Sequence, residues 1–243
     1  SVKQKVIKEK EISRKIILRD NIKFDDVSFA YSINNDNNVI SNINFEIKFG
    51  ESIGIIGKTG SGKSTTVDLM MGLLKPSKGR ILVDNFDINN IENSCLNSWR
   101  RSIAHVPQSI FLTDNSILEN IAFGFQYEEI DLNLVKQVSE LALIDKFIES
   151  TIHGYKSTVG EYGVSLSGGQ KQRIGIARAF YKIYKTNTNL IVFDEATNAL
   201  DEKTENKIIK SLMDINITKI IISHNLNNLS GCNRIIDVSK DIN

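Results

Sequence analysis

A glycine-rich loop with one lysine is the part of this sequence best suited to bind phosphate. Gly57, Gly62, Lys63 and Ser64 match the pattern G-x-x-x-x-G-K-[ST], and the loop lies between an apolar run and a helical segment. Glycines let backbone N–H groups turn inward around a phosphate, and a helix N-terminus adds a positive dipole end. Lys63 can neutralise phosphate oxygens, and the Ser64 hydroxyl can bind Mg²⁺. The context disfavours an ordinary glycine-rich turn and predicts a phosphate site.

Two adjacent carboxylates end an apolar run in the last third of the chain. Asp194 and Glu195 follow the four apolar residues 190–193. A buried strand of this composition places Asp194 at its carboxyl end, where α/β sheets bind ligands and an aspartate can hold Mg²⁺ through water. Glu195 can then orient or deprotonate an attacking water. A strand that ends in solvated acids is the alternative, and the glycine-rich loop disfavours it.

The spacing of apolar residues indicates the elements that must position these groups. Alternating and β-branched runs predict antiparallel strands that lead into a buried strand, and three- and four-residue spacing predicts helices. The last third alternates strand, helix and strand, which is typical of a parallel sheet with crossover helices. The expected strands lie within 22–55, 73–87, 189–195 and 218–224, and the expected helices begin at the glycine-rich loop or lie within 114–150, 168–184 and 202–214.

Composition excludes several classes of protein. The chain has 243 residues and is 41% hydrophobic, which is enough apolar material for a full core. Its 30 Lys and Arg balance 29 Asp and Glu, so the charge predicts no nucleic-acid partner. Cys95 and Cys232 lie far apart outside any metal-binding spacing, which predicts free thiols. No run predicts a membrane helix. Because the chain begins with Ser1, we expect a piece of a longer protein.

A second glycine motif carries a family resemblance. Residues 166–170 read LSGGQ and precede a helical segment that begins at Lys171. At this motif the sequence resembles the nucleotide-binding domain of ABC ATPases, and the likeness extends from about residue 21 to the end. It implies an α/β fold with a P-loop NTPase (RecA-like) core, an antiparallel β subdomain and an inserted α-helical subdomain at about 109–185. Residues 1–20 would then be a linker from a membrane domain.

The resemblance also implies roles for single residues. Tyr31 would stack on adenine, Gln108 would contact Mg²⁺ and sense the transport partner, His224 would hold the γ-phosphate, and Asp201 would be the carboxylate of a loop that crosses to another subunit. Without the resemblance, Tyr31 and His224 would be ordinary packing or surface residues. The implied catalytic set is Glu195, His224, Lys63 and Gln108; the implied nucleotide-binding set is Tyr31, Gly57, Lys58, Thr59, Gly60, Ser61, Gly62, Lys63, Ser64, Thr65, Ser167, Gly168, Gly169, Gln170 and Asp201; and the implied metal-binding set is Ser64, Gln108 and Asp194.

The implied cofactors are ATP and Mg²⁺, and the implied partners are protein chains. In this family two domains pair head to tail, so the Ser167 motif of a second copy or a close paralogue would cover the nucleotide on the glycine-rich loop. The stretches 108–124 and 158–173, which include the pair Gly160-Glu161, are similar to the exporter branch, whose transmembrane domain precedes the ATPase domain. This implies ATP-powered export or flipping of a substrate across a membrane, with the ATPase domain at the cytoplasmic face of an inner or plasma membrane.

The sequence departs from the family pattern at a few positions. Asn198 stands where exporters more often have Ser, and Asn225 follows His224 where Arg is common. Neither change removes a catalytic group. The chain ends at SKDIN, where relatives usually continue. A non-transport ABC ATPase that uses ATP as a dimerisation switch is the alternative, and the intact Glu195 and His224 favour a hydrolysing enzyme.

Overall fold

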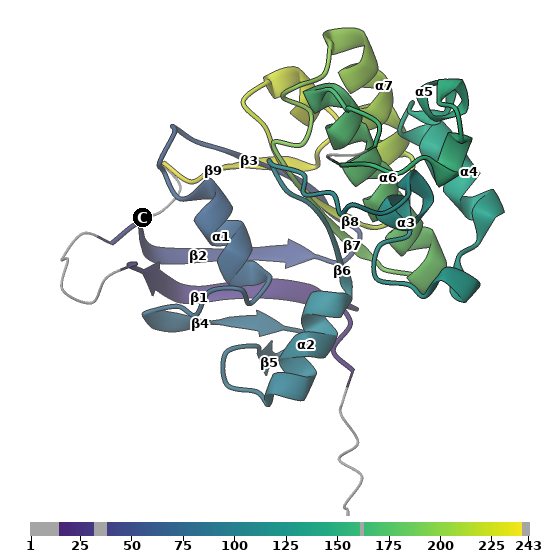
Figure 1. Cartoon of the computed structure of the whole chain (residues 1–243). Helices are drawn as coiled ribbons and strands as arrows, with labels where there is room; N and C mark the ends of the chain where they lie inside the picture. The colour runs from purple at the N-terminus through teal and green to yellow at the C-terminus, as the bar shows by residue number, and fades with distance from the viewer. Residues whose placement is uncertain (1–14, 32–37, 161–162, 240–243) are drawn as a thin grey trace, which may run out of the picture.

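An antiparallel sheet forms one outer layer of the molecule. The structure is a computed structural model that describes residues 15–31, 38–160 and 163–239. The sheet has the strand order β2-β1-β4-β5, and every neighbouring pair in it is antiparallel. Its strands are β1 (Asn21–Phe29), β2 (Ile40–Lys48), β4 (Lys78–Val83) and β5 (Phe86–Asp87). Two helices lie beside this sheet in Figure 1, α1 (Lys63–Met70) and α2 (Asn93–Arg101).

A parallel sheet forms the middle layer. Its strand order is β6-β7-β8-β3-β9, and every neighbouring pair is parallel. The carboxyl ends of all its strands therefore lie at one edge, which confirms the parallel sheet that the sequence predicted. The strands are β3 (Ser52–Ile56), β6 (Ile103–Val106), β7 (Leu190–Asp194), β8 (Thr218–Ile222) and β9 (Arg234–Asp237).

The parallel sheet separates two hydrophobic cores. Along β7, Leu190 and Val192 pack into the core shared with the antiparallel sheet, whereas Ile191 and Phe193 pack into the core shared with the helices. This alternation follows from the two-residue period of a strand, and it explains why β7 is apolar on both faces. The sheet is thus enclosed on both sides, as the layers in Figure 1 indicate.

The remaining helices cover the other face of the parallel sheet (Figure 1). The longest, α6, begins with a capping box in which Ser167 and Gln170 exchange hydrogen bonds, and it ends at Asn187 in the left-handed conformation. Ile176, Phe180 and Ile183 of α6 are buried at helical spacing. The helices are α3 (Ile117–Ile121), α4 (Leu132–Leu141), α5 (Asp145–Ser150), α6 (Gly168–Thr186) and α7 (Glu202–Met213), with single 3-10 turns at Tyr127–Glu129, Gly154–Lys156 and Leu226–Leu229.

Three further expectations from the sequence concern the N-terminal segment, the two cysteines and membrane helices. Ile16 and Leu18 are buried in the core beside the antiparallel sheet, whereas residues 1–14 lie outside the described part. Cys95 and Cys232 are free thiols, and burial raises the pKa of Cys232 to about 11. Within the described ranges, none of the helices has the length and apolar character needed to cross a bilayer.

Candidate nucleotide-binding site

The carboxyl ends of four neighbouring strands build one site. β3 leads into the glycine-rich loop, β6 is followed by Gln108 after one proline, β7 ends at Asp194, and β8 is followed by Ser223 and His224. A cavity of about 510 Å³ lies at this edge. It is lined by Tyr31, Val39, Thr59, Gly60, Gly62, Lys63, Ser64, Thr65, Gln108, Glu195 and His224.

Lys63 lies across the inside of the glycine-rich loop. Its Nζ donates to the carbonyl oxygens of Gly57 at 3.0 Å and Lys58 at 3.2 Å. Gly62 has a φ of 91°, which favours glycine, and at Gly57 a Cβ would lie 2.5 Å from the Ser61 Oγ. The loop is therefore tight enough to require glycine and holds one cation at its centre. Ser61 Oγ is buried and has no hydrogen-bond partner among the described atoms, so the loop fits a phosphate group.

Asp194 and Ser64 fit a magnesium ion. The Asp194 residue is 8% exposed, and its Oδ1 has no hydrogen-bond partner within the described ranges. Burial raises the pKa of Asp194, and a hydrogen bond from Ser64 opposes that rise. A buried carboxylate oxygen without a partner needs a cation or a donor, and Mg²⁺ prefers oxygen ligands of this kind.

Glu195 is held by three side chains from three segments. His224 Nε2 lies 2.7 Å from Oε1, while Oε2 accepts hydrogen bonds from Gln108 Nε2 at 2.9 Å and from Asn198 Nδ2 at 3.0 Å. The Glu195 side chain is only 11% exposed. The contact from Asn198 was not predicted, and the only signal in the sequence is that Asn stands where exporters more often have Ser.

Tyr31 presents an exposed aromatic ring at the cavity. The residue is 67% exposed, and its hydroxyl oxygen lies 3.1 Å from Thr65 Oγ1. The ring meets Phe29 edge-on, with centroids 4.9 Å apart. Because the hydroxyl and one edge are held, the ring has a defined orientation, which suits stacking on a planar base. Val39, an apolar lining residue without a sequence motif, was not predicted.

The glycines of the second motif lie in a separate cavity. It has a volume of about 440 Å³ and shares no lining residue with the first cavity. Ser167 Oγ accepts from the Gln170 N–H at 3.3 Å and begins α6, while Asp201 accepts from the Thr204 N–H at 3.0 Å and begins α7. A hydrogen bond with the Thr204 side chain lowers the pKa of Asp201. The second cavity is lined by Ser167, Gly168, Gly169, Arg173, Ala199, Leu200, Asp201 and Thr204.

The fold and the loop after β3 define the class of protein as a P-loop NTPase. A family model described as "ABC transporter" matches residues 40–198, more than half of the chain. The chain therefore belongs to the ABC transporter family and carries its ATP-binding domain, the ATPase of these transporters.

Known proteins with similar sequences or structures are much longer. The chain is 41% identical over 233 residues to the alpha-hemolysin translocation ATP-binding protein HlyB of Escherichia coli O157:H7, covering 94% of this chain and 31% of that protein. It is 37% identical over 217 residues to the ATP-dependent lipid A-core flippase of Chromohalobacter salexigens, covering 88% and 36%. A solved bacterial Atm1-family ABC exporter with ATP bound matches with a TM-score of 0.82 and 34% identity, covering 91% of this chain and 38% of the other. The chain thus spans about a third of these relatives.

Proposed function

We propose that this chain powers an exporter by binding and hydrolysing ATP. The observation that carries the proposal is the placement of Lys63, Asp194, Glu195 and His224 around the carboxyl ends of adjacent strands. These residue types match the needs of phosphoryl transfer: a cation for phosphate oxygens, a metal ligand, a base and a donor toward the transferred phosphate. The proposal that transport is export rests on the similarity to exporters and flippases.

Each proposed role follows from chemistry and position. Residues 57–65 bind the phosphates, with Lys63 as the cation, and Tyr31 stacks on the adenine. Ser64 and Asp194 hold Mg²⁺, which when bound neutralises charge on the phosphates. Glu195 orients or deprotonates the attacking water. Gln108 and His224, which both contact Glu195, complete the site.

Two copies are proposed to close around two nucleotides. The first cavity is lined by the glycine-rich loop of residues 57–64, here called the phosphate loop, but by none of residues 166–170. The second cavity is lined by Ser167, Gly168 and Gly169 but not by the phosphate loop. A second chain placed head to tail would set its Ser167 motif against the phosphate loop. The paired glycines at a helix N-terminus allow close approach to a γ-phosphate, and Asp201 lies on the same face. A close paralogue could take the place of the second copy.

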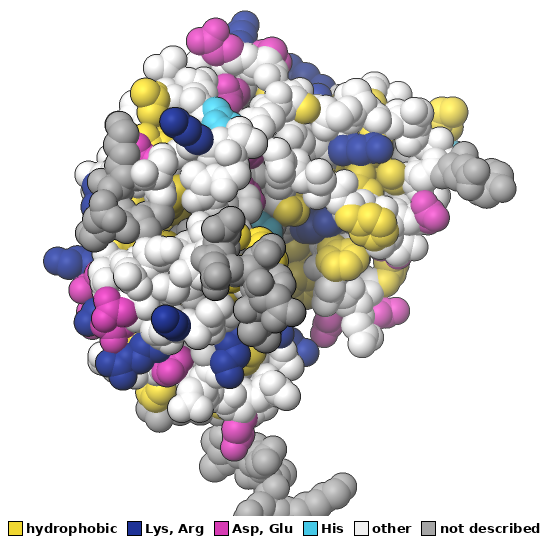
Figure 2. Space-filling model, turned by 90° about the vertical axis from the view of Figure 1, so that its left-hand side faces the viewer, with side chains coloured by type: hydrophobic (Ala, Val, Ile, Leu, Met, Phe, Trp, Pro, Cys, Tyr) yellow, Lys and Arg dark blue, Asp and Glu magenta, His cyan; other side chains and the backbone are white. Residues whose placement is uncertain are grey.

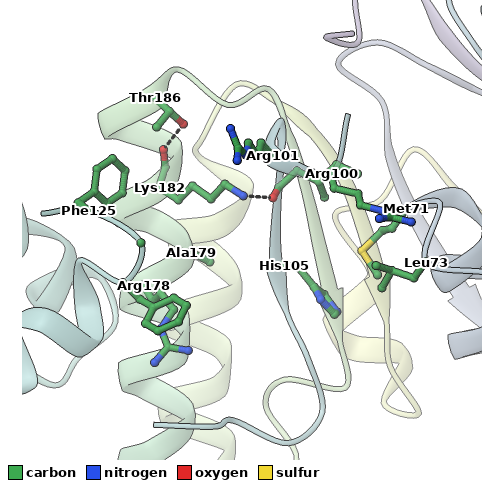
Figure 3. A pocket seen from close by; sticks show the side chains of 13 residues that line it. Met71, Leu73, Arg100, Arg101, His105, Phe125, Arg178, Ala179, Lys182 and Thr186 are labelled. Atoms are coloured by element: carbon green, nitrogen blue, oxygen red, sulfur yellow. Dashed lines mark hydrogen bonds between the residues drawn. The ribbon is translucent and has the colours of Figure 1, made fainter. Parts of the chain in front are cut away.

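We also propose that a transmembrane domain docks in a groove with a volume of about 740 Å³ (Figure 3). The side chains of Arg100, Arg101, Arg178 and Lys182 line it, and none forms an ion pair with a carboxylate among the described residues. Arg100 and Lys182 instead donate to backbone oxygens. The groove therefore suits a short segment that carries both carboxylates and apolar side chains.

Apolar side chains border the same groove. Phe123 is 53% exposed, and the Arg178 guanidinium carbon lies 4.9 Å from the centroid of its ring. On the face drawn in Figure 2, hydrophobic side chains lie beside Lys and Arg side chains along a hollow. In this proposal residues 1–20 link the ATPase domain to the membrane domain, which holds the chain at the cytoplasmic face.

The head-to-tail proposal is tested with a variant that binds ATP but hydrolyses it slowly. In Glu195→Gln, turnover should fall by roughly 10²- to 10⁴-fold while ATP binding persists, because the amide keeps the shape but cannot accept a proton. Retained ATP should then shift monomer to dimer, as measured by light scattering after size-exclusion chromatography with ATP and Mg²⁺. Adding Ser167→Arg should abolish the dimer. A Glu195→Gln chain that binds ATP yet stays monomeric, alone and within the full-length transporter, would contradict the pairing.

Docking and transport are tested in the full-length transporter. Arg101→Glu should lower substrate export while the isolated domain keeps its ATP turnover, because Arg101 is exposed in the groove and lies outside the nucleotide cavity. Lys136→Glu, a charge reversal at an exposed position of α4, is the matched control. Slow or absent steady turnover together with ATP-dependent pairing would instead favour the non-transport switch.

A further inference from the structure

The Glu195 side chain is anchored from within its own loop. Glu195 has a φ of 49°, in the left-handed region that non-glycine residues rarely adopt. The backbone then turns back, and the Asn198 N–H donates to the Glu195 carbonyl oxygen at 3.3 Å. This turn brings the Asn198 side chain toward the carboxylate, so its Nδ2 donates to Oε2 at 3.0 Å.

The loop that carries Asn198 is itself held in place. The Ala199 N–H donates to Gln172 Oε1 of α6 at 3.0 Å, and Thr197 Oγ1 donates to Glu205 Oε1 of α7 at 2.5 Å. Both neighbours of Asn198 are therefore tied to helices of the core. Although Asn198 itself is exposed, its position and the direction of its amide are defined by these contacts.

The contacts of Glu195 differ in how they can respond to a nucleotide. Gln108 and His224 both line the cavity where we place the phosphates and Mg²⁺, so their side chains face the ligand as well as Glu195. Asn198 does not line this cavity. A ligand in the cavity can therefore compete for the side chains of Gln108 and His224, but not for that of Asn198.

We propose that Asn198 is a positioning residue for hydrolysis, which holds Glu195 Oε2 and so fixes the orientation of the carboxylate for the attacking water. This inference rests on the proposed role of Glu195 as base. An asparagine suits the task because its Nδ2 donates to the carboxylate without adding a charge beside it. Once Gln108 and His224 turn toward the ligand, loss of the Asn198 donor leaves the Glu195 carboxylate able to rotate, and rotation of the base away from the water lowers the rate of the chemical step.

The test compares four substitutions by steady-state ATP turnover. Asn198→Ala should lower kcat by roughly tenfold with KM for ATP changed less than about twofold, because the hydrogen bond to a charged acceptor is lost but the nucleotide contacts remain. Asn198→Asp should lower kcat further, by about 100-fold, since this isostere cannot donate when ionised and repels Glu195. Asn198→Ser keeps a donor and should lie closer to wild type than Asn198→Ala. Asn133→Ala, an exposed asparagine of α4, is the matched control.

A second measurement, by NMR, detects the hydrogen bond between Asn198 and Glu195 independently of catalysis. The side-chain amide resonances of Asn198, assigned through their loss in Asn198→Ala, should shift in Glu195→Ala, whereas those of Asn133 should not. Unchanged Asn198 resonances would overturn the inference even if a variant folded poorly. Wild-type kcat in both Asn198→Ala and Asn198→Asp, beside a large loss in Glu195→Gln, would overturn it while leaving the proposed base intact. Full turnover in Glu195→Gln would overturn both.

Discussion

The Nε2 atom of His224 lies 2.7 Å from Oε1 of Glu195. The two residues follow the adjacent strands β8 and β7, and the Glu195 N–H also donates to the carbonyl oxygen of Ile222 at 3.0 Å. The backbone pairing therefore brings the two residues to neighbouring positions at the edge of the sheet. His224 is 51% exposed, so its ring can reach into the cavity from this position. In the proposed mechanism, a donor next to Glu195 can hold the transferred phosphate in line with the water.

We expect His224→Ala to lower ATP turnover by roughly 10²- to 10³-fold, the range observed when one donor to a developing charge is removed. ATP affinity should change by less than about fivefold, since the phosphate loop keeps its own contacts. A coupled phosphate-release assay and a fluorescence titration measure the two quantities. His153→Ala, an exposed histidine outside the cavity, is the control. Wild-type turnover in His224→Ala would remove His224 from the catalytic set.

We expect Lys63→Ala to lose most of its ATP affinity. Each charge-assisted hydrogen bond to a phosphate oxygen is worth about 1.5 to 3 kcal/mol, so the loss should be at least about tenfold. Lys63 also bridges two carbonyl oxygens of the loop, which means that the loop loses a support as well as a charge. A fluorescence titration with ATP and Mg²⁺ measures the effect, with the exposed Lys75→Ala as control. Equal ATP affinities of Lys63→Ala and the wild type would contradict the role of the glycine-rich loop as the phosphate-binding site.

Substitutions of Tyr31 separate ring stacking from hydrogen bonding. Tyr31→Ala should weaken ATP binding by about 1 to 3 kcal/mol, whereas Tyr31→Phe should preserve it because the ring remains. The phenylalanine variant loses the contact with Thr65 Oγ1, so it isolates the contribution of that contact. Calorimetric titration of both variants is the measurement. A Tyr31→Phe affinity as low as that of Tyr31→Ala would show that the hydroxyl matters and the ring does not.

Stability should fall in mild acid because of His105. Burial, and secondarily the charge of Lys182, lower the pKa of His105 to about 4, and its buried Nε2 has no hydrogen-bond partner among the described atoms. The unfolded chain, with a histidine pKa near 6.5, binds more protons between about pH 6.5 and 4. The free energy of unfolding is therefore highest above that window and falls as the pH decreases through it, by up to about 3 kcal/mol.

Urea unfolding at pH 7.5 and pH 5.0 measures this dependence. His105→Gln removes the titrating group, so the difference in unfolding free energy between the two pH values should shrink. His153→Gln, which changes an exposed histidine, should keep the wild-type difference. The same difference in His105→Gln as in wild type would contradict the assignment to His105.

Much of the fold could be predicted because its central strands carry a strong signal. β3, β7 and β8 are buried apolar runs, and α6 combines a capping box with a periodic apolar face. α2, β6 and β9 were missed. Of the residues of α2 only Trp99 is buried, so it lacks an apolar stripe, and β6 and β9 have four residues each, too few for a period to be recognised.

The site could be predicted only as far as residue types and motifs extend. The phosphate loop and the carboxylates after β7 have local patterns, and the structure brings them together. The contacts of Glu195 depend on its left-handed backbone conformation and on the turn to Asn198, which no local pattern specifies. The groove lined by Arg100, Arg101, Arg178 and Lys182 combines residues from Met71 to Thr186 that meet only in the folded chain. Such features follow from tertiary packing rather than from propensity.

The pairing of β3 has a consequence for synthesis of the chain on the ribosome. The neighbours of β3 in the sheet are β8 and β9, so Ile53 pairs with Ile220 and Arg234, residues made some 170 to 180 positions later. Until those residues emerge, the strand that carries the phosphate loop has two open edges and an apolar sequence, a combination that invites wrong pairing. The nascent chain therefore gains a complete nucleotide site, and the stabilisation that bound ATP supplies, only after β8 and β9 have been made.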